Sequence, residues 1–160
     1  MTKRLYIAYG SNLNRQQMKV RCPGASVVGT AVIKDYRLLF RGSKTGAYLT
    51  IEPHKDGMVP AAVWSVTAED ERRLDRYEGA PIFYRKEEME LPVVDIRSGA
   101  VRNLSGFVYV MCDGRPLGLP SNDYFMVCAQ GYRGFGFDPK ILLDAYSDSR
   151  REDVLWNAIW

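Results

Sequence analysis

The sequence predicts an α+β fold: a small mixed, mostly antiparallel β-barrel or curved sheet with flanking helices. Apolar, strand-like runs dominate the first half of the 160 residues, and few helical patterns separate them. Strands joined by short connections pair most readily as antiparallel neighbours. Helical patterns become frequent in the last third. No repeat or linker divides the chain, and its length suits one compact domain over residues 1–160.

The expected strands are apolar runs bounded by turn residues. The first ends at Gly10 and reads as buried, and Lys34-Asp35 separates the second from the third. The polar segment 52–57 is expected to be a turn between the fourth and fifth. The sixth is long, with a bend at Pro92. Six or seven strands are expected, from the runs 5–9, 27–33, 36–40, 48–51, 59–66, 84–96 and 106–112.

Two of the expected helices lie in the first half of the chain. Residues 14–22 favour a short helix that stops where a proline and a glycine follow Cys22. Thr67 is expected to cap a second helix, whose first turn carries acidic residues where the helix dipole favours negative charge. This second helix is expected to end at Gly79, a residue type typical of helix C-termini.

The last third is expected to be helical. Ser121 is a candidate cap for a helix that runs to residue 132. Asp138 followed by Pro139 is typical of another helix start. Residues 150–160 are expected to form a terminal helix. Its predicted buried stripe consists of Leu155, Trp156 and Ile159.

Charge and cysteine content exclude several classes of function. Twenty-two Lys and Arg residues against 19 Asp and Glu give a net charge of +3, which is too mild to predict binding to nucleic acid or membranes. The first apolar run is too short for a signal-peptide core, so we expect a cytoplasmic protein. The three cysteines form no Cys-x-x-Cys pair and read as small core residues in a reducing compartment: Cys22, Cys112 and Cys128.

Glu78 is the candidate for proton transfer. It lies four residues after Leu74, the only large aliphatic residue of its helix, so the two share the face expected to meet the core. Burial and the C-terminal end of a helix dipole both raise the pKa of a carboxyl group, towards the range useful for proton transfer. The alternative is a solvent-exposed glutamate at a frayed helix end.

A candidate ligand loop follows the first strand and precedes a helix. Such a loop can direct several backbone N–H groups at an anion, and a glycine permits close approach. The alternative is an ordinary capped turn, because the loop matches neither a P-loop nor a dinucleotide-binding pattern. The residues of the loop are Tyr9, Gly10, Ser11, Asn12 and Leu13.

Other polar residues give weaker signals. Tyrosines on strands and helices most often pack in the core, although a hydroxyl that reaches a cleft can orient a substrate. The tyrosines in question are Tyr84, Tyr109 and Tyr124. His54 is the single histidine and is expected in a solvated turn, so neither a Ser-His-Asp triad nor a zinc site is predicted. The possible partners for a carboxylate are Arg21, Arg41 and Arg85.

An ordered series of short motifs resembles the γ-glutamylcyclotransferase family. The motifs span nearly the whole chain in the family's order, and the set is more specific than any one of them. They are YGSNL at 9–13, RCPGA at 21–25, DYRLLF at 35–40, VW at 63–64, LDRYEG at 74–79, YR at 84–85, VYVM at 108–111 and PSNDY at 120–124.

The resemblance implies a small mixed β-barrel and an enzyme that cyclises a γ-glutamyl compound to 5-oxoproline, releasing an amino acid or an amine. It implies that Glu78 is the general acid/base and that no metal or organic cofactor takes part. A small γ-glutamyl molecule is the implied partner, rather than nucleic acid or a membrane. The implied substrate-binding residues are Tyr9, Gly10, Ser11, Asn12, Leu13, Tyr84, Tyr109 and Tyr124.

Several alternatives stay open at this point. The Gly-Ser-Asn-Leu loop resembles the branch acting on γ-glutamyl amino acids and its bacterial relatives, some of which unmask γ-glutamyl-protected amines in antibiotic biosynthesis. The leaving amine and the oligomeric state are therefore open. A binding module that kept the pocket and lost catalysis is one rival. A protein-interaction domain that docks through Trp156 and Trp160 is another.

Overall fold

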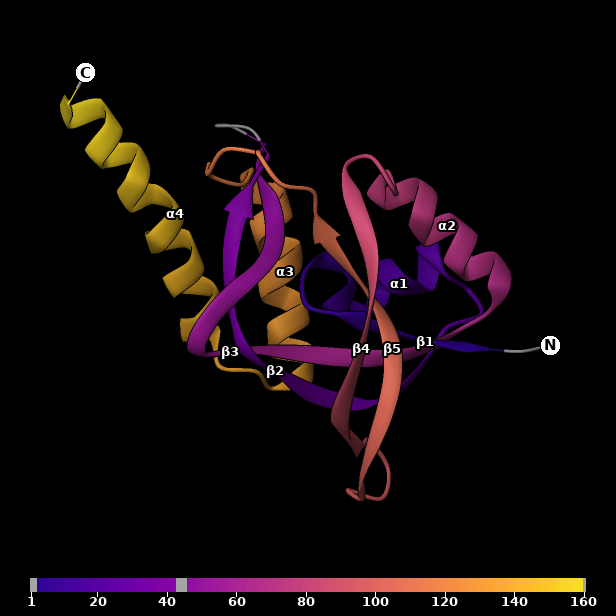
Figure 1. Ribbon diagram of the computed structural model, residues 1–160. Coiled ribbons are helices and arrows are strands. Elements are labelled where there is room, and N and C mark those ends of the chain that lie inside the picture. Colours follow the sequence, from indigo (N-terminus) through magenta and orange to yellow (C-terminus); the bar gives the residue numbers. More distant parts are fainter. Residues whose placement is uncertain (1–2, 43–45, 160) are drawn as a thin grey trace.

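The computed structural model describes the backbone of residues 3–42 and 46–159, and side chains as far as residue 150. Within these ranges, five strands form a closed barrel in the order β1-β3-β2-β4-β5 (Figure 1). Neighbouring strands are antiparallel except β1 and β5, which are parallel, so the predicted mixed and mostly antiparallel barrel is confirmed. The strands are β1 (Arg4–Ala8), β2 (Ser26–Arg41), β3 (Tyr48–Val66), β4 (Tyr84–Asp95) and β5 (Val101–Met111).

Two long strands replace four expected short ones. Both β2 and β3 continue through the segments predicted to separate strands, and the pairing register shifts between Lys34 and Tyr36. Asp35 and Asp56 adopt positive φ angles of 63° and 64°, and the Asp56 N–H donates to Asp35 Oδ1 at 3.0 Å. The expected turn at 52–57 is therefore wrong: the segment is an irregularity within β3, and His54 is an exposed strand residue.

The helices surround the barrel on different sides. In Figure 1, α1 and α2 lie together on one side, α4 lies on the opposite side, and α3 lies between them. The expected terminal helix is the continuation of α4, and the side chains predicted to form its buried stripe lie outside the described residues, as does Trp160. The helices are η1 (Ser11–Leu13, a 3-10 turn), α1 (Arg15–Arg21), α2 (Ala68–Glu78), α3 (Asn122–Phe135) and α4 (Pro139–Ile159).

Local capping sets the ends of α2, the helix that carries Glu78. The Thr67 hydroxyl accepts from the Asp70 N–H at 3.0 Å, and the Asp70 carboxylate accepts from the Thr67 N–H at 3.2 Å. This reciprocal pair satisfies two N–H groups that have no partner inside the helix. Gly79 ends α2 in the left-handed conformation, with a φ of 63°. The predicted start and end of the helix are confirmed, and Glu78 is its last residue.

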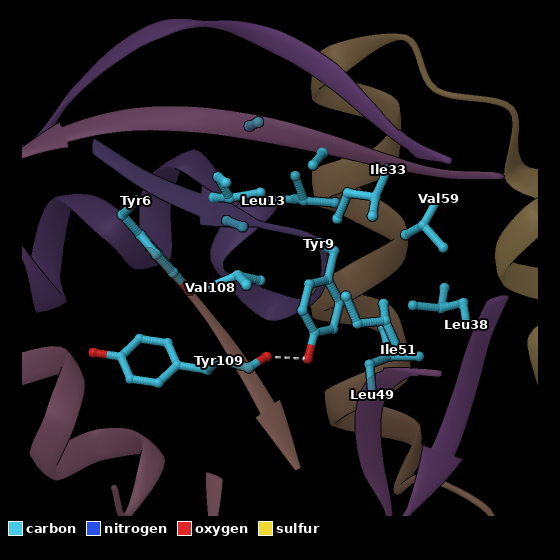
Figure 2. Close-up of a cluster of buried hydrophobic side chains, with 14 of the residues drawn as sticks. Tyr6, Tyr9, Leu13, Ile33, Leu38, Leu49, Ile51, Val59, Val108 and Tyr109 are labelled. Carbon is cyan, nitrogen blue, oxygen red and sulfur yellow. Dashed lines mark hydrogen bonds between the residues drawn. The ribbon is translucent and has the colours of Figure 1, made fainter. Parts of the chain in front are cut away.

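The hydrophobic core fills the barrel and continues towards α3 (Figure 2). Leu13 is fully buried and packs against α3, where Gly131 permits a close approach. A Cβ atom on Gly131 would lie 2.6 Å from the Cβ of Leu13, inside any normal contact distance. The packing of α3 therefore fixes η1 relative to the barrel. No helix in the described part of the chain is both long and apolar enough to traverse a membrane.

Candidate active site

A cavity of about 430 Å³ lies where the end of β1, the η1 turn and the C-terminal end of α2 meet. This volume is within the range that holds small molecules. The structure brings eight of the nine predicted site residues to its wall, and Leu13 is the exception because its side chain belongs to the core. The eight are Tyr9, Gly10, Ser11, Asn12, Glu78, Tyr84, Tyr109 and Tyr124.

Glu78 contributes a carboxyl group to this cavity from the last position of α2. Leu74, one turn earlier, is buried in the core, as the shared face predicted. Burial raises the pKa of Glu78 from 4.5 to about 7, and the positive charge of Arg21 partly opposes this shift. Among the described residues, no hydrogen bond or ion pair engages the Glu78 carboxyl group. The group therefore combines a pKa near neutrality with freedom to exchange a proton with a ligand.

The η1 turn forms another part of the cavity wall and has backbone donors that are free within the turn. Ser11 and Asn12 open this short helix, so their N–H groups have no acceptor within it. The Leu13 N–H donates to the Gly10 carbonyl at 3.0 Å and closes the turn. A Cβ atom on Gly10 would lie 3.5 Å from both Leu49 Cβ and the Tyr124 hydroxyl, so glycine leaves the space against the cavity wall open.

Arg21 connects the η1 turn to α2. Its guanidinium donates to Asn12 Oδ1 at 2.6 Å and to Ser11 Oγ at 3.4 Å. It also donates to the Tyr77 hydroxyl and lies 3.3 Å from the centre of that ring. Of the three arginines predicted as carboxylate partners, this is the one beside the cavity. Arg41 and Arg85 pair instead with Glu52 and Glu87, respectively.

The buried tyrosines of the wall are held by hydrogen bonds to the barrel and to α2. Tyr9 donates to the Tyr109 carbonyl at 2.6 Å, and Figure 2 shows the Tyr109 ring turned away from this contact. The Tyr109 hydroxyl donates to Asp75 of α2 at 2.5 Å. Tyr84 donates to the Leu49 carbonyl at 2.7 Å. These bonds join distant segments, so the wall is rigid around the cavity.

Comparison with known proteins connects this cavity to a family. A family model described as "Gamma-glutamyl cyclotransferase, AIG2-like" matches residues 6–126. The chain belongs to this family. The matched range contains every residue that lines the cavity. A search of curated proteins gives no match for the chain.

Several solved structures have a similar fold. A protein named "Gamma-glutamyl cyclotransferase" is 23% identical, with 93% of this chain and 87% of that chain covered and a TM-score of 0.72. An uncharacterized protein from Homo sapiens is 25% identical, with 94% and 88% covered and a TM-score of 0.72. A yeast γ-glutamyl cyclotransferase specific to glutathione is 11% identical, with 95% and 97% covered and a TM-score of 0.66.

In this γ-glutamyl cyclotransferase family member, the cavity also contains residues that sequence reasoning missed. The sequence indicates only that Tyr6 belongs to a buried strand, although a buried tyrosine needs a partner for its hydroxyl. Tyr77 and Tyr48 are about half exposed, and together with Phe83 they form an aromatic part of the wall. The position of Tyr77 next to Glu78, on a mostly charged helix, is the signal that could have found it.

The remaining candidates contribute nothing to this cavity of the γ-glutamyl cyclotransferase fold. Cys22 and Cys128 are buried thiols, as predicted, whereas Cys112 is partly exposed. Burial raises the pKa of Cys22 to about 11 and that of Cys128 to about 12, so both stay protonated near neutrality. In the part of the chain that the structure describes, no group of three or more His, Cys, Asp or Glu side chains is arranged to hold a metal ion.

Proposed function

We propose that this chain cyclises a γ-glutamyl compound to 5-oxoproline and releases an amino acid or an amine, with Glu78 as the proton carrier. Membership of the family supports γ-glutamyl cyclotransferase activity in general. The observation that carries the finer proposal is the Glu78 carboxyl group, which has no partner among the described residues, has a pKa of about 7 and lines the same cavity as Ser11 and Asn12 of η1.

The reaction needs a proton carrier because its nucleophile arrives protonated. Glu78 removes a proton from the substrate's α-ammonium group, and the amine attacks the γ-carbonyl carbon. The new C–N bond forms as the carbonyl electrons move to oxygen. When the carbonyl reforms, the bond to the leaving nitrogen breaks, and Glu78 returns the proton to that nitrogen. The attacking nitrogen loses a second proton as the lactam forms, and the released amine takes up this proton and leaves as its ammonium form. No water is consumed, and the nucleophile is tethered, which raises its effective concentration to about 10⁵ M or more in well-oriented cases.

Binding of the glutamyl part is the second requirement. We assign the N–H groups of Ser11 and Asn12 to the α-carboxylate or to the developing oxyanion, because donors fixed before reaction stabilise charge most effectively. Tyr9, Gly10, Tyr84, Tyr109 and Tyr124 are proposed to shape the same pocket. Leu13 is proposed to act indirectly, since its packing under the turn supports the backbone of Ser11 and Asn12.

The test is replacement of Glu78 by glutamine, which keeps the size of the side chain and removes its acid–base chemistry. Glu78→Gln should lower kcat by about 10²–10⁴-fold, the usual contribution of general acid–base catalysis. Release of 5-oxoproline from a panel of γ-glutamyl amino acids, γ-glutamyl amines and glutathione measures the effect. The matched control is Glu90→Gln, because Glu90 is an exposed glutamate of β4.

Two outcomes would contradict the proposal. Near-normal turnover by Glu78→Gln would remove Glu78 from the chemistry. Thermal stabilisation of the wild-type chain by 5-oxoproline, with no product from any substrate of the panel, would favour a binding module that has lost catalysis.

A further inference from the structure

The hydroxyl protons of the buried tyrosines around the cavity can be assigned one at a time. Each hydroxyl has one proton to donate and lone pairs to accept. Tyr9, Tyr84 and Tyr109 already donate their protons to a carbonyl or a carboxylate of the protein. None of these three has a proton left for a ligand unless an existing bond breaks.

Tyr124 is fixed as an acceptor. Its hydroxyl oxygen accepts from the Leu49 N–H at 3.1 Å. The donor is a backbone amide of β3, so no side chain sets the direction of the Tyr124 hydroxyl proton.

Tyr6 also accepts, but from a side chain whose orientation is itself fixed. Asn12 Nδ2 lies 2.9 Å from the Tyr6 hydroxyl, and Asn12 Oδ1 lies 2.6 Å from the Arg21 guanidinium. A guanidinium has only donors, so the amide oxygen of Asn12 must face Arg21 and its NH₂ group must face Tyr6. The Tyr6 oxygen receives that bond, and its own proton points elsewhere. No described protein group accepts this proton, and Tyr6 lines the cavity.

We infer that Tyr6 donates its hydroxyl proton to the γ-carbonyl oxygen of the substrate as negative charge develops there, and that Arg21 and Asn12 are the positioning residues that aim it. This inference rests on the proposed cyclisation and adds a side-chain donor to the backbone donors of η1. Fixed donors directed at the place where charge develops are a large source of rate acceleration.

The surroundings keep Tyr6 in the donor form. Burial raises the pKa of Tyr6 well above its usual value, and the negative charge of Glu78 raises it further. The hydroxyl is therefore protonated at any pH at which the chain is folded and active. Tyr6 is nearly inaccessible to solvent and is stacked on Phe107, with ring centres 5.3 Å apart, so its ring has one orientation.

The first test removes the hydroxyl. Tyr6→Phe should lower kcat by about 10²–10³-fold, the usual cost of losing one oxyanion donor, and leave KM within a few-fold of the wild-type value. The control is Tyr132→Phe, because Tyr132 is a buried tyrosine of α3 outside the cavity. A ring that only supports the fold would not separate kcat from KM in this way.

The second test keeps the hydroxyl and turns its proton. In Asn12→Asp, one carboxylate oxygen faces Arg21 and the other can only accept, so Tyr6 must donate to it and no longer to the cavity. Measured on the pH plateau of each variant, Asn12→Asp should lose kcat to a similar extent as Tyr6→Phe. The double variant should be no worse than either single variant, since both remove the same donor.

Calorimetric binding of 5-oxoproline, whose lactam oxygen corresponds to the reacting carbonyl oxygen, separates this inference from the proposed function. If the wild-type chain turns over and Tyr6→Phe keeps both kcat and affinity, the inference fails while the function stands. If the wild-type chain binds 5-oxoproline without turnover and Tyr6→Phe weakens binding several-fold, the function fails while the donor stands. If the wild-type chain neither binds 5-oxoproline nor turns over any substrate, both the inference and the proposed function fail.

Discussion

At the scale of single residues, the state of the Glu78 carboxyl group governs the proposed chemistry. Two environments act on it in opposite directions: burial in the cavity raises its pKa, and the nearby Arg21 lowers it. The result, a pKa of about 7, lets one group take a proton and return it without a large energetic penalty in either direction.

The pH dependence of turnover follows from this pKa. The group must be ionised to accept the ammonium proton, so kcat/KM should rise roughly tenfold between about pH 6 and the plateau, with an apparent pKa near 7. A pH profile with a γ-glutamyl substrate measures it. The residual activity of Glu78→Gln should lack this acid limb, whereas Glu90→Gln should keep it. A wild-type profile that stays flat down to about pH 5 would contradict the assignment.

Sequence reasoning located the carboxyl group but not the tyrosine donor. Glu78 could be predicted because helical periodicity places it on the face of Leu74, and that face is buried in the structure. Tyr6 could not, because its role depends on the orientation of the Asn12 amide, which is set by Arg21 at the end of another helix. Periodicity says which residues are buried but not which hydroxyl protons remain free.

At the scale of elements, local signals gave the helices more accurately than the strands. Capping residues act within one turn, so the ends predicted for α2 at Thr67 and Gly79 agree with the structure. Asp35 and Asp56 carry the same positive φ in a bulge as they would in a turn. Whether such a residue lies in a bulge or in a turn depends on the long-range pairing of β2 with β3. A local sequence pattern does not reveal this pairing.

The contact between α3 and η1 gives a prediction for these elements. Gly131→Ala should destabilise the protein by about 1–3 kcal/mol, the typical cost of forcing an extra group into a packed core. It should also lower turnover, because the displaced Leu13 belongs to the turn that carries Ser11 and Asn12. Urea unfolding and steady-state kinetics measure the two effects.

Gly134, in the same helix, provides the control. A Cβ atom there would meet no other atom within 4 Å, so Gly134→Ala should be neutral or stabilising by about 0.5–1 kcal/mol. Equal effects of the two substitutions would show that the close approach of α3 does not support the turn.

At the scale of the whole molecule, the site reduces stability. The pKa of Glu78 is about 7 in the folded chain, above the 4.5 of the free side chain. The folded state is therefore favoured by the protonated group below about pH 4.5, and this contribution is lost as the pH rises through about 7. Above neutrality, the folded chain contains a partly buried, ionised carboxylate that would be better solvated in the unfolded chain.

Glu78→Gln should consequently be more stable than the wild type in alkaline solution. We expect its free energy of unfolding to exceed that of the wild type by about 1–3 kcal/mol near pH 8.5, and the difference to vanish near pH 4.5. Urea unfolding at the two pH values measures it. A difference that is the same at both would mean that the carboxyl group is not desolvated in the folded chain.

The cavity wall takes its residues from most of the length of the chain, from Tyr6 in β1 to Tyr124 in α3. An N-terminal fragment that ends before Tyr124 lacks at least one of the residues that line the cavity. A ribosome must therefore add more than three quarters of the 160 residues before a γ-glutamyl molecule can find a competent pocket. Appearance of 5-oxoproline during translation would mark the moment at which the last helices dock, so catalysis itself would report completion of folding.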